Sequence, residues 1–452
     1  MGKISIRNLK VWLENTVWGE VFSKDEEGIG RKNIITAGIM STIFNAFISG
    51  TFYTGFLLAM GIDIVNIGII SSITLVTGFF NIFSPMVLNR FKTRKKFLIF
   101  VRLTYHAVNI LGITLLPFLP LGTGGKIVML CVFVFISGTI VNVTSPGWSA
   151  WHVVYLGDNT MRTKYLSLQM VINGAVSALT VLISGQLANF VTSLGEEMEI
   201  TFIVILRLIG FVLAMFEVYY LTRPREPEYH STGSGTSFLA IFREPFRYKI
   251  FLATVIVVFV WNFASYVSSS AFSAYVLDTL KISYGEITVI DSLYSIFLFL
   301  LVPFWRKYIA QHSMFTALII TMLAYGVTFL FPLFFTPENA HVLYPTMRIV
   351  QHIFGTGLNL AFGNLPWVHM PNKDRTTCLA FYSLAANIFA LLGQIVGTSI
   401  IAADSGHVHN ILFLQLDSVQ LLLLIQTVIV FVIVVYIAVM RKKLEEPGDE
   451  QI

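Results

Sequence analysis

The stretch "PMVLNRFKTRKKF" (residues 85–97) places five cations within residues 89–97 of a chain in which 12% of residues are charged. Long apolar runs precede and follow it. The chain has 452 residues, is 55% hydrophobic and has a mean hydropathy of +0.75. A soluble protein of this length could not cover so much apolar surface with so few charges. The stretch is therefore typical of a loop that joins two membrane spans.

Twelve apolar runs are long enough to cross a bilayer, which requires roughly 20 mostly apolar residues. We predict spans at residues 34–60, 64–88, 97–119, 126–149, 164–190, 200–222, 250–276, 286–305, 314–334, 342–367, 377–402 and 416–440. An even number of spans places both termini on the same side of the membrane.

The distribution of Lys and Arg indicates which side that is. Of the 30 such residues, three lie within spans and two, Lys126 and Lys281, lie in loops on one side; the remaining 25 lie on the side of the termini. This asymmetry is a strong positive-inside signal. We therefore predict a multi-pass protein of the cell inner (plasma) membrane with both termini cytoplasmic, and residues 85–97 form a cytoplasmic loop.

The predicted spans divide the chain into two groups of six. We expect an N-terminal bundle at 34–222, a cytoplasmic linker rich in Pro, Gly and Ser at 223–249, and a C-terminal bundle at 250–440. A cytoplasmic tail at 441–452 follows. Residues 1–33 are predicted to be an amphipathic cytoplasmic segment, in which 8–22 either lies on the membrane surface through its aromatic residues or is a tail without function.

Several classes of protein are disfavoured by the sequence. The only cysteines, Cys131 and Cys378, lie in apolar runs, which argues against a disulfide framework or a zinc site. No phosphate-binding loop and no H-E-x-x-H motif is present, so we expect no enzyme activity, no cofactor and no metal. The net charge of +5 is explained by membrane orientation, so no nucleic-acid partner is expected.

The two halves of the chain resemble each other at an offset of about 217 residues. Asn45 then falls on Asn262, and Pro85 falls within one residue of Pro303. The segment "SGTIVN" (137–142) falls on "FGTGLN" (354–359), and "RTKYL" (162–166) falls on "RTTCL" (375–379) after a short gap. Duplication of a six-span unit is typical of secondary transporters.

Twelve spans in two sixes with a basic loop after the second span resemble the major facilitator superfamily. The loop of that family reads roughly G-x-L-A-D-R-x-G-R-K-K; here Pro85 stands at the glycine, Asn89 at the aspartate, Arg90 at its arginine and Lys92 at the second glycine. The signatures of drug antiporters, sugar porters and peptide porters are absent, so the subfamily is not identified. The resemblance implies an all-α integral membrane fold of twelve transmembrane helices in two six-helix bundles.

Charged residues of the cytoplasmic loops are candidate gating groups. In the family, the loop after span two locks cytoplasmic helix ends through charge pairing, which implies such a role for Arg90 and Arg94. The loops "DNTMRTK" (158–164) and "NKDRTT" (372–377) each begin a helix with acidic and basic residues, which can cap or clamp helix ends. This adds three candidates, which are Arg162, Asp374 and Arg375.

Amide and aromatic residues are candidate solute-binding groups. The resemblance implies that spans one, four, seven and ten line a central cavity, and these spans carry Asn45, Asn142, Trp148, Trp261, Asn262, His352 and Asn359. Amides donate and accept hydrogen bonds, and Trp offers a flat apolar face, so this lining suits a small neutral or zwitterionic organic solute. The alternative is that the amides only join helices through hydrogen bonds.

Ionisable residues within spans require a partner or a hydrated cavity. Arg348 and His352 lie one turn apart on span ten. They could bind an anionic group of a solute with His352 linked to a proton, or Arg348 could snorkel outward while His352 bonds a carbonyl. Asp291 on span eight is a candidate coupling site or a structural partner of Arg348. For Arg102 and Glu217, a structural ion pair is favoured.

The sequence therefore predicts a secondary active transporter that moves a small polar organic solute by alternating access. The solute would be sugar-like or resemble an amino acid or organic acid, with symport of a proton or sodium as the coupling ion. A lipid or lipid-precursor transporter on the same fold is the alternative, which the 39 Phe residues favour. We expect membrane lipids around the protein and a monomeric state.

Overall fold

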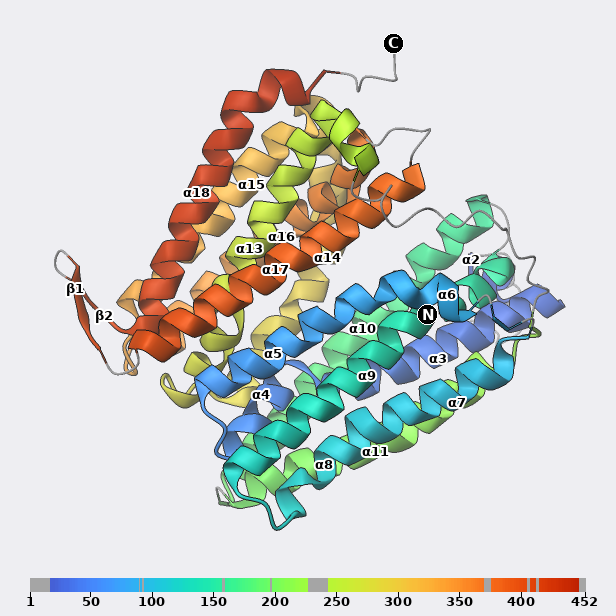
Figure 1. Cartoon of the computed structure of the whole chain (residues 1–452), viewed down its shortest axis with the longest axis horizontal. Helices are drawn as coiled ribbons and strands as arrows, with labels where there is room; N and C mark the ends of the chain where they lie inside the picture. Colours follow the sequence, from blue (N-terminus) through green and yellow to red (C-terminus); the bar gives the residue numbers. More distant parts are fainter. Residues whose placement is uncertain are drawn as a thin grey trace, which may run out of the picture. The chain divides into compact units, whose positions relative to one another are not determined.

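The structure is a computed structural model that describes residues 17–88, 90–91, 93–156, 159–195, 197–226, 243–369, 375–404, 407–411 and 414–446. Nearly all of these residues are helical (Figure 1). The helices of the first half are α2 (Val17–Val21), α3 (Glu26–Ile48), α4 (Gly50–Ala59), α5 (Ile64–Gly78), α6 (Ser84–Leu88), α7 (Lys95–His106), α8 (Ile113–Leu115), α9 (Thr123–His152), α10 (Asn159–Thr192) and α11 (Glu197–Leu221).

The second half contains five long helices and one of intermediate length. They are α13 (Lys249–Asp278), α14 (Tyr284–His312), α15 (Met314–Thr328), α16 (Ala340–Val368), α17 (Arg375–Asp404) and α18 (Ser418–Leu444). Between the last two, β1 (His409–Ile411) and β2 (Leu414–Leu416) pair antiparallel, with Asn410 opposite Gln415. This small hairpin was not predicted, and α18 begins only after it.

Short polar side chains set where several helices begin, because they accept hydrogen bonds from backbone N–H groups that have no partner within the helix. Asp63 accepts from the N–H of Asn66 at the start of α5. Ser283 and Glu286 form a capping box at the start of α14, and Asp417 and Gln420 do the same for α18. These starts are therefore local in origin.

Eleven helical segments in the described part of the chain are long and apolar enough to cross a membrane. They correspond to the predicted spans except span ten, whose helix α16 has 29 residues but is not among the eleven. The polar residues of α16, which include Arg348, Gln351 and His352, lower its mean hydropathy. This helix carries most of the candidate site.

Some predicted spans contain breaks that hydropathy does not reveal. The helix of span one begins at Glu26, well before the predicted residue 34. It breaks between α3 and α4, where Gly50 has a φ of 59°, a backbone conformation that favours glycine. Span three changes from α-helix to π-helix at Ala107–Gly112 before α8. Span two ends in a 3₁₀ segment, Phe79–Phe83, followed by α6.

The chain separates into two compact units. The first contains residues 1–53, 80–184 and 191–231, and the second contains 54–79, 185–190 and 232–452. The helix α5 therefore packs within the second unit, whereas the bundle boundaries at 34–222 and 250–440 remain predictions. In the first unit, an aromatic core formed by Trp148, Trp151, Tyr155 and Tyr165 joins α9 and its 3₁₀ extension to α10.

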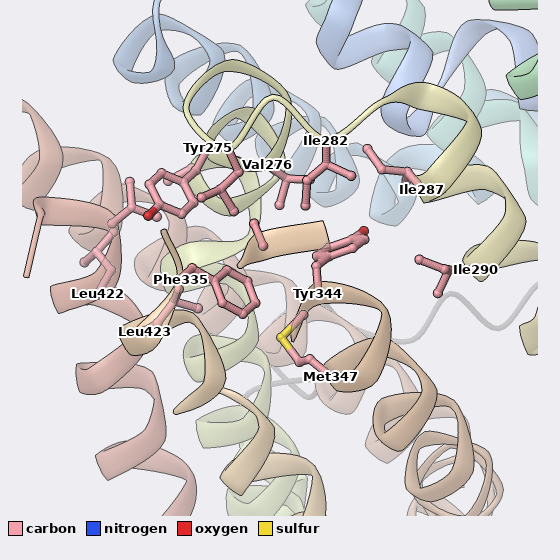
Figure 2. Packing of buried hydrophobic residues seen from close by; sticks show 14 of the residues in the cluster. Tyr275, Val276, Ile282, Ile287, Ile290, Phe335, Tyr344, Met347, Leu422 and Leu423 are labelled. Carbon is pink, nitrogen blue, oxygen red and sulfur yellow. The ribbon is translucent and has the colours of Figure 1, made fainter. Parts of the chain in front are cut away.

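The second unit is organised around α13. A Cβ atom at Gly397 of α17 would lie 1.8 Å from the carbonyl oxygen of Val267, so glycine allows α13 and α17 to pack at close range. Figure 2 shows the apolar core at the end of α13, where Tyr275, Ile287, Ile290, Tyr344 and Met347 bring α13, α14 and α16 together. This packing fixes the relative positions of α14 and α16 beside the polar residues described next.

Candidate functional site

A cavity of about 360 Å³ lies in the second unit where polar residues of α14 and α16 converge. Its volume falls within the range of small-molecule sites, which is roughly 300–1,000 Å³. It is lined by Trp261, Asp291, Tyr294, Tyr325, Arg348, Gln351, His352, Gly355, Leu358 and Asn359. The lining combines an ion pair, two amides, two phenols and aromatic faces.

Arg348 and Asp291 form the ion pair of this cavity. Nη2 of Arg348 lies 2.5 Å from Oδ1 of Asp291, and the two side chains remain 27% and 34% exposed. Nη1 of Arg348 donates to Oε1 of Gln351 at 2.9 Å, and Nε2 of Gln351 donates to Oγ1 of Thr328 at 3.0 Å. Arg348 therefore does not extend away from the bundle, because Asp291 of α14 and Gln351, which is itself bonded to α15, hold its guanidinium at the cavity.

The polar and aromatic wall of the cavity comes from four further lining residues, which are Asn359, Tyr294, Trp261 and Tyr325. Nδ2 of Asn359 donates to the hydroxyl oxygen of Tyr294 at 2.8 Å. The ring of Trp261 stacks on Phe362 with centroids 5.5 Å apart and meets Tyr325 edge-on at 5.9 Å. A solute in this cavity would therefore meet hydrogen-bonding groups on one side and the indole on another.

His352 is bonded to the backbone of α14. Its Nε2 lies 3.0 Å from the carbonyl oxygen of Ile290, and because a carbonyl only accepts, Nε2 donates. The other ring nitrogen, Nδ1, then carries no proton in the neutral ring. This arrangement matches the expectation that His352 bonds a neighbouring carbonyl, although the residue also lines the cavity.

Helical periodicity explains why these residues share one cavity. Arg348, His352, Gly355 and Asn359 lie at intervals of three or four on α16, which places them along one face. Asp291 and Tyr294 are three residues apart on α14 and also share a face. Packing of the two faces produces both inter-helix contacts, Arg348 to Asp291 and Asn359 to Tyr294.

The other three candidate asparagines are placed differently. Asn45 donates to the carbonyl of Ser41, Asn142 to that of Gly138 and Asn262 to that of Val258, each within its own helix. None of them lines the cavity of the second unit. A role for Asn45, Asn142 and Asn262 in solute binding remains a prediction.

A second cavity, of about 460 Å³, lies in the first unit and includes Trp148. Arg102 of α7 and Glu217 of α11 also line it, and their ion pair has Nη2 and Oε1 2.5 Å apart. The expected pairing of these two residues is therefore present. Trp148 stacks on Trp151 with ring centroids 5.5 Å apart.

The predicted gating residues that the structure describes lie at or near helix ends. Arg90 is exposed in the turn after α6, and Arg162 is half-buried in the first turns of α10. The backbone N–H groups of Arg94 and Lys95 both donate to Oε1 of Glu226, which caps the start of α7. Asp374 lies outside the described residues, and Arg375 is the first residue of α17. Their gating roles remain predictions.

Some residues that make contacts between segments were not singled out in the sequence. Tyr294 could have been found from its spacing to Asp291, and Gln351 from its position next to His352. His106 and Glu226 gave no signal, because their importance depends on contacts with residues more than a hundred positions away. Among the described residues, no group of three or more His, Cys, Asp or Glu side chains could hold a metal ion.

Comparisons with known proteins agree with this architecture. The family model described as Major Facilitator Superfamily matches residues 250–451. Comparison with curated proteins gave no match. Among solved structures, a bacterial homologue of the iron transporter ferroportin in an inward-facing state has a TM-score of 0.67 and 14% identity, and the match covers 93% of this chain and 99% of that one.

Two further solved structures have the same fold. A mutant of the nucleoside transporter NupG has a TM-score of 0.66 and 13% identity, with coverage of 91% of this chain and 99% of that one. A D-xylose-proton symporter has a TM-score of 0.62 and 14% identity, with coverage of 90% and 96%. At these identities the structural likeness shows the fold alone.

The apolar helices indicate a multi-pass membrane protein. Residues 250–451 match the Major Facilitator Superfamily model, and the described helices have the all-α fold of the solved transporters to which the chain is similar.

Proposed function

We propose that the protein is a secondary active transporter that moves a small polar organic solute by alternating access, coupled to an ion gradient. We further propose that the solute binds in the cavity between α13, α14, α15 and α16. The observation that carries this proposal is the convergence of the Arg348–Asp291 pair, the Asn359–Tyr294 pair and Trp261 on one cavity of about 360 Å³.

The chemistry of this lining favours particular solutes. A partly exposed ion pair can bind the carboxylate and ammonium groups of a zwitterion, since each charged partner gains a second charge-assisted hydrogen bond. The amide and the phenol offer donors and acceptors to hydroxyl groups, and the indole of Trp261 can contact the apolar face of a ring. Amino acids, small peptides, sugars and nucleosides are therefore the solutes to test first.

The proposal is tested by reconstitution in liposomes with an imposed proton or sodium gradient. The panel contains an amino acid mixture, a dipeptide, D-xylose and uridine, and uptake of each is measured with and without the gradient. Gradient-dependent accumulation of at least one solute is expected. A protein that accumulates none of them and instead equilibrates labelled phospholipids between leaflets would contradict the proposal and favour the lipid alternative.

A pair of variants on α16 tests the site itself. Asn359→Ala removes the bond to Tyr294 at the cavity and should raise the KM of uptake by up to about 10-fold, since a neutral hydrogen bond contributes roughly 0.5–1.5 kcal/mol. The matched control is Asn364→Ala, because Asn364 is exposed, bonds the carbonyl of Leu360 in its own helix and does not line the cavity. Equal effects of the two substitutions would argue against this solute site.

A further inference from the structure

The first unit holds a cluster of titratable residues that the proposed solute site does not use. It consists of Arg102 and His106 of α7 and Glu217 of α11. Oε1 of Glu217 accepts from Nη2 of Arg102 at 2.5 Å, and Oε2 lies 3.1 Å from Nε2 of His106. The side chains of Glu217 and His106 are 3% and 0% exposed. Nε of Arg102 also donates to Oε2 at 3.3 Å, so Arg102 holds both oxygens of this deeply buried carboxylate and His106 holds one of them.

The hydrogen-bond geometry defines where the proton of the His106 ring lies. A carboxylate only accepts, so Nε2 of His106 donates to Glu217 and carries the proton of the neutral ring. Nδ1 is then an unprotonated acceptor, and it is buried without a hydrogen-bond partner. Buried acceptors without a partner are uncommon, and this one is the atom at which the ring could take up another proton.

The surroundings of His106 contain few other charges. Besides Glu217 and Arg102, the titratable groups nearby are Tyr105 on α7 and His152 on α9, whose Nε2 donates to the carbonyl of Leu221. From α3, Phe44 presents a ring edge to the imidazole with centroids 5.3 Å apart. With a neutral His106, the charges of Arg102 and Glu217 cancel. An added proton would therefore give the cluster a net charge of only one.

A cavity borders this cluster. Arg102, Glu217 and His152 line the cavity of about 460 Å³ in the first unit, together with Trp148 and Gln169. The side chain of Arg102 is 17% exposed there. The π-helix Ala107–Gly112 begins directly after His106, and such segments occur frequently at functional sites. The cluster is therefore buried, and Arg102 and Glu217 connect it to this cavity.

We propose that His106, Glu217 and Arg102 form a proton-binding site that couples transport by this protein to a proton gradient. This inference rests on the proposed ion-coupled transport and names the ion and its site. The added proton comes from cavity water, converts the neutral imidazole to imidazolium and returns to water later in the cycle. While bound, it raises the charge of the cluster by one unit.

The consequence for transport follows from the charge of the cluster. Once His106 is an imidazolium, it and Arg102 both pair with the single carboxylate of Glu217, so the cluster carries one net positive charge. Because Arg102 and Glu217 line the cavity of the first unit, this charge is present at that cavity. A state of the transport cycle that accommodates the charge better therefore binds the proton more tightly, and the proton favours that state in return, which is the requirement for coupling.

The first test is solute-independent. Purified wild-type protein and the variant His106→Gln are titrated potentiometrically between about pH 8 and pH 5, the range in which His changes charge. Gln keeps a donor for Glu217 but cannot take up a proton. We expect the wild type to bind about one proton more than His106→Gln over this range. Identical titration curves would overturn the proposal.

The second test links the proton to transport. Proteoliposomes with an imposed proton gradient are compared with proteoliposomes that exchange labelled for unlabelled solute without a gradient, using the panel of amino acids, dipeptide, D-xylose and uridine. We expect His106→Gln to lose gradient-driven accumulation and to keep exchange. The matched control His312→Gln removes an exposed histidine at the end of α14 and should keep both. Retained accumulation in His106→Gln would show that this site does not couple transport.

Each outcome separates this inference from the proposed function. A wild type that takes up no solute in response to any gradient, yet binds the extra proton, would contradict the proposed function and the coupling role while leaving the proton site in place. If His106→Gln does not fold, Glu217→Gln serves as the second variant. It keeps the shape of the carboxylate and removes the charge that holds the imidazolium, and the same loss of proton binding is expected.

Discussion

Each compact unit contains an arginine and a carboxylate that join two helices, and the two pairs have different surroundings. In the first unit, Glu217 is 3% exposed and is held by both Arg102 and His106. In the second unit, Asp291 is 34% exposed and pairs with Arg348 at the wall of a cavity. The two pairs have the same chemistry, so exposure of the carboxylate decides which of them can bind a solute directly.

This difference leads to different expectations for mutation. A buried pair is costly to break, because the remaining charge stays in a low-dielectric surrounding without compensation. A partly exposed pair loses less on mutation, because water or a solute can replace the missing partner. The first pair should therefore govern stability, and the second should govern solute affinity.

The largest effect is expected for Glu217→Ala. This substitution leaves Arg102 without its carboxylate and should lower the free energy of unfolding by about 3–5 kcal/mol. The measurement is the midpoint of thermal unfolding in detergent, with Asp278→Ala as the control, since Asp278 is an exposed residue paired with Lys281. If the two substitutions lowered the midpoint equally, the buried pair would not be a determinant of stability.

An intermediate effect is expected for Asp291→Asn, and it should appear in uptake more than in stability. A charge-assisted hydrogen bond contributes roughly 1.5–3 kcal/mol to the free energy of binding. Its loss corresponds to about a 10- to 150-fold rise in the KM of uptake. The midpoint of thermal unfolding should fall less than in Glu217→Ala. An unchanged KM together with a large fall in the midpoint would show that the second pair is structural as well.

The same contrast shows what could be predicted from the sequence. The spans and the basic loop followed from hydropathy and charge, and α16 departed from the hydropathy pattern because its polar face lines a cavity. Asp291, Arg348, His352, Asn359 and Trp261 were predicted as functional and do converge. The bonds from Asn359 to Tyr294 and from Arg348 to Gln351, which is anchored on Thr328, depend on how α14, α15 and α16 pack. No local sequence pattern encodes that packing.

The asparagines illustrate the limit of such predictions. A polar residue in a span either faces a cavity or bonds the carbonyl of the preceding turn. The sequence pattern around such a residue does not distinguish the two arrangements. Asn359 reaches Tyr294 on another helix, whereas Asn45 and Asn262 bond their own helices. The π-helix after His106 was also beyond prediction, because nothing in "HAVNILG" (106–112) distinguishes it from an ordinary helix.

The smallest effect is expected for a third carboxylate, which serves as an exposed reference for the two pairs. Glu445 follows α18 and accepts from the hydroxyl of Ser313 at 2.6 Å and from Nε of Arg441 at 2.8 Å. The hydrogen bond from Ser313, followed by that from Arg441, lowers the pKa of Glu445 below its usual value. The Glu445 carboxylate therefore stabilises the fold at pH values above the pKa that this carboxyl has in the unfolded chain. This stabilisation is lost as the pH falls through the lower pKa of the folded state.

Glu445→Gln should accordingly change the free energy of unfolding by no more than about 1 kcal/mol near neutral pH, as for other exposed ion pairs. The difference from the wild type should shrink as the pH is lowered from the unfolded-chain pKa of about 4.3 through the lower pKa of the folded state, where the wild-type carboxylate also becomes protonated. Unfolding midpoints measured at several pH values check this. A difference as large as that of Glu217→Ala would mean that burial does not separate these carboxylates, and the distinction between the two pairs would lose its physical basis.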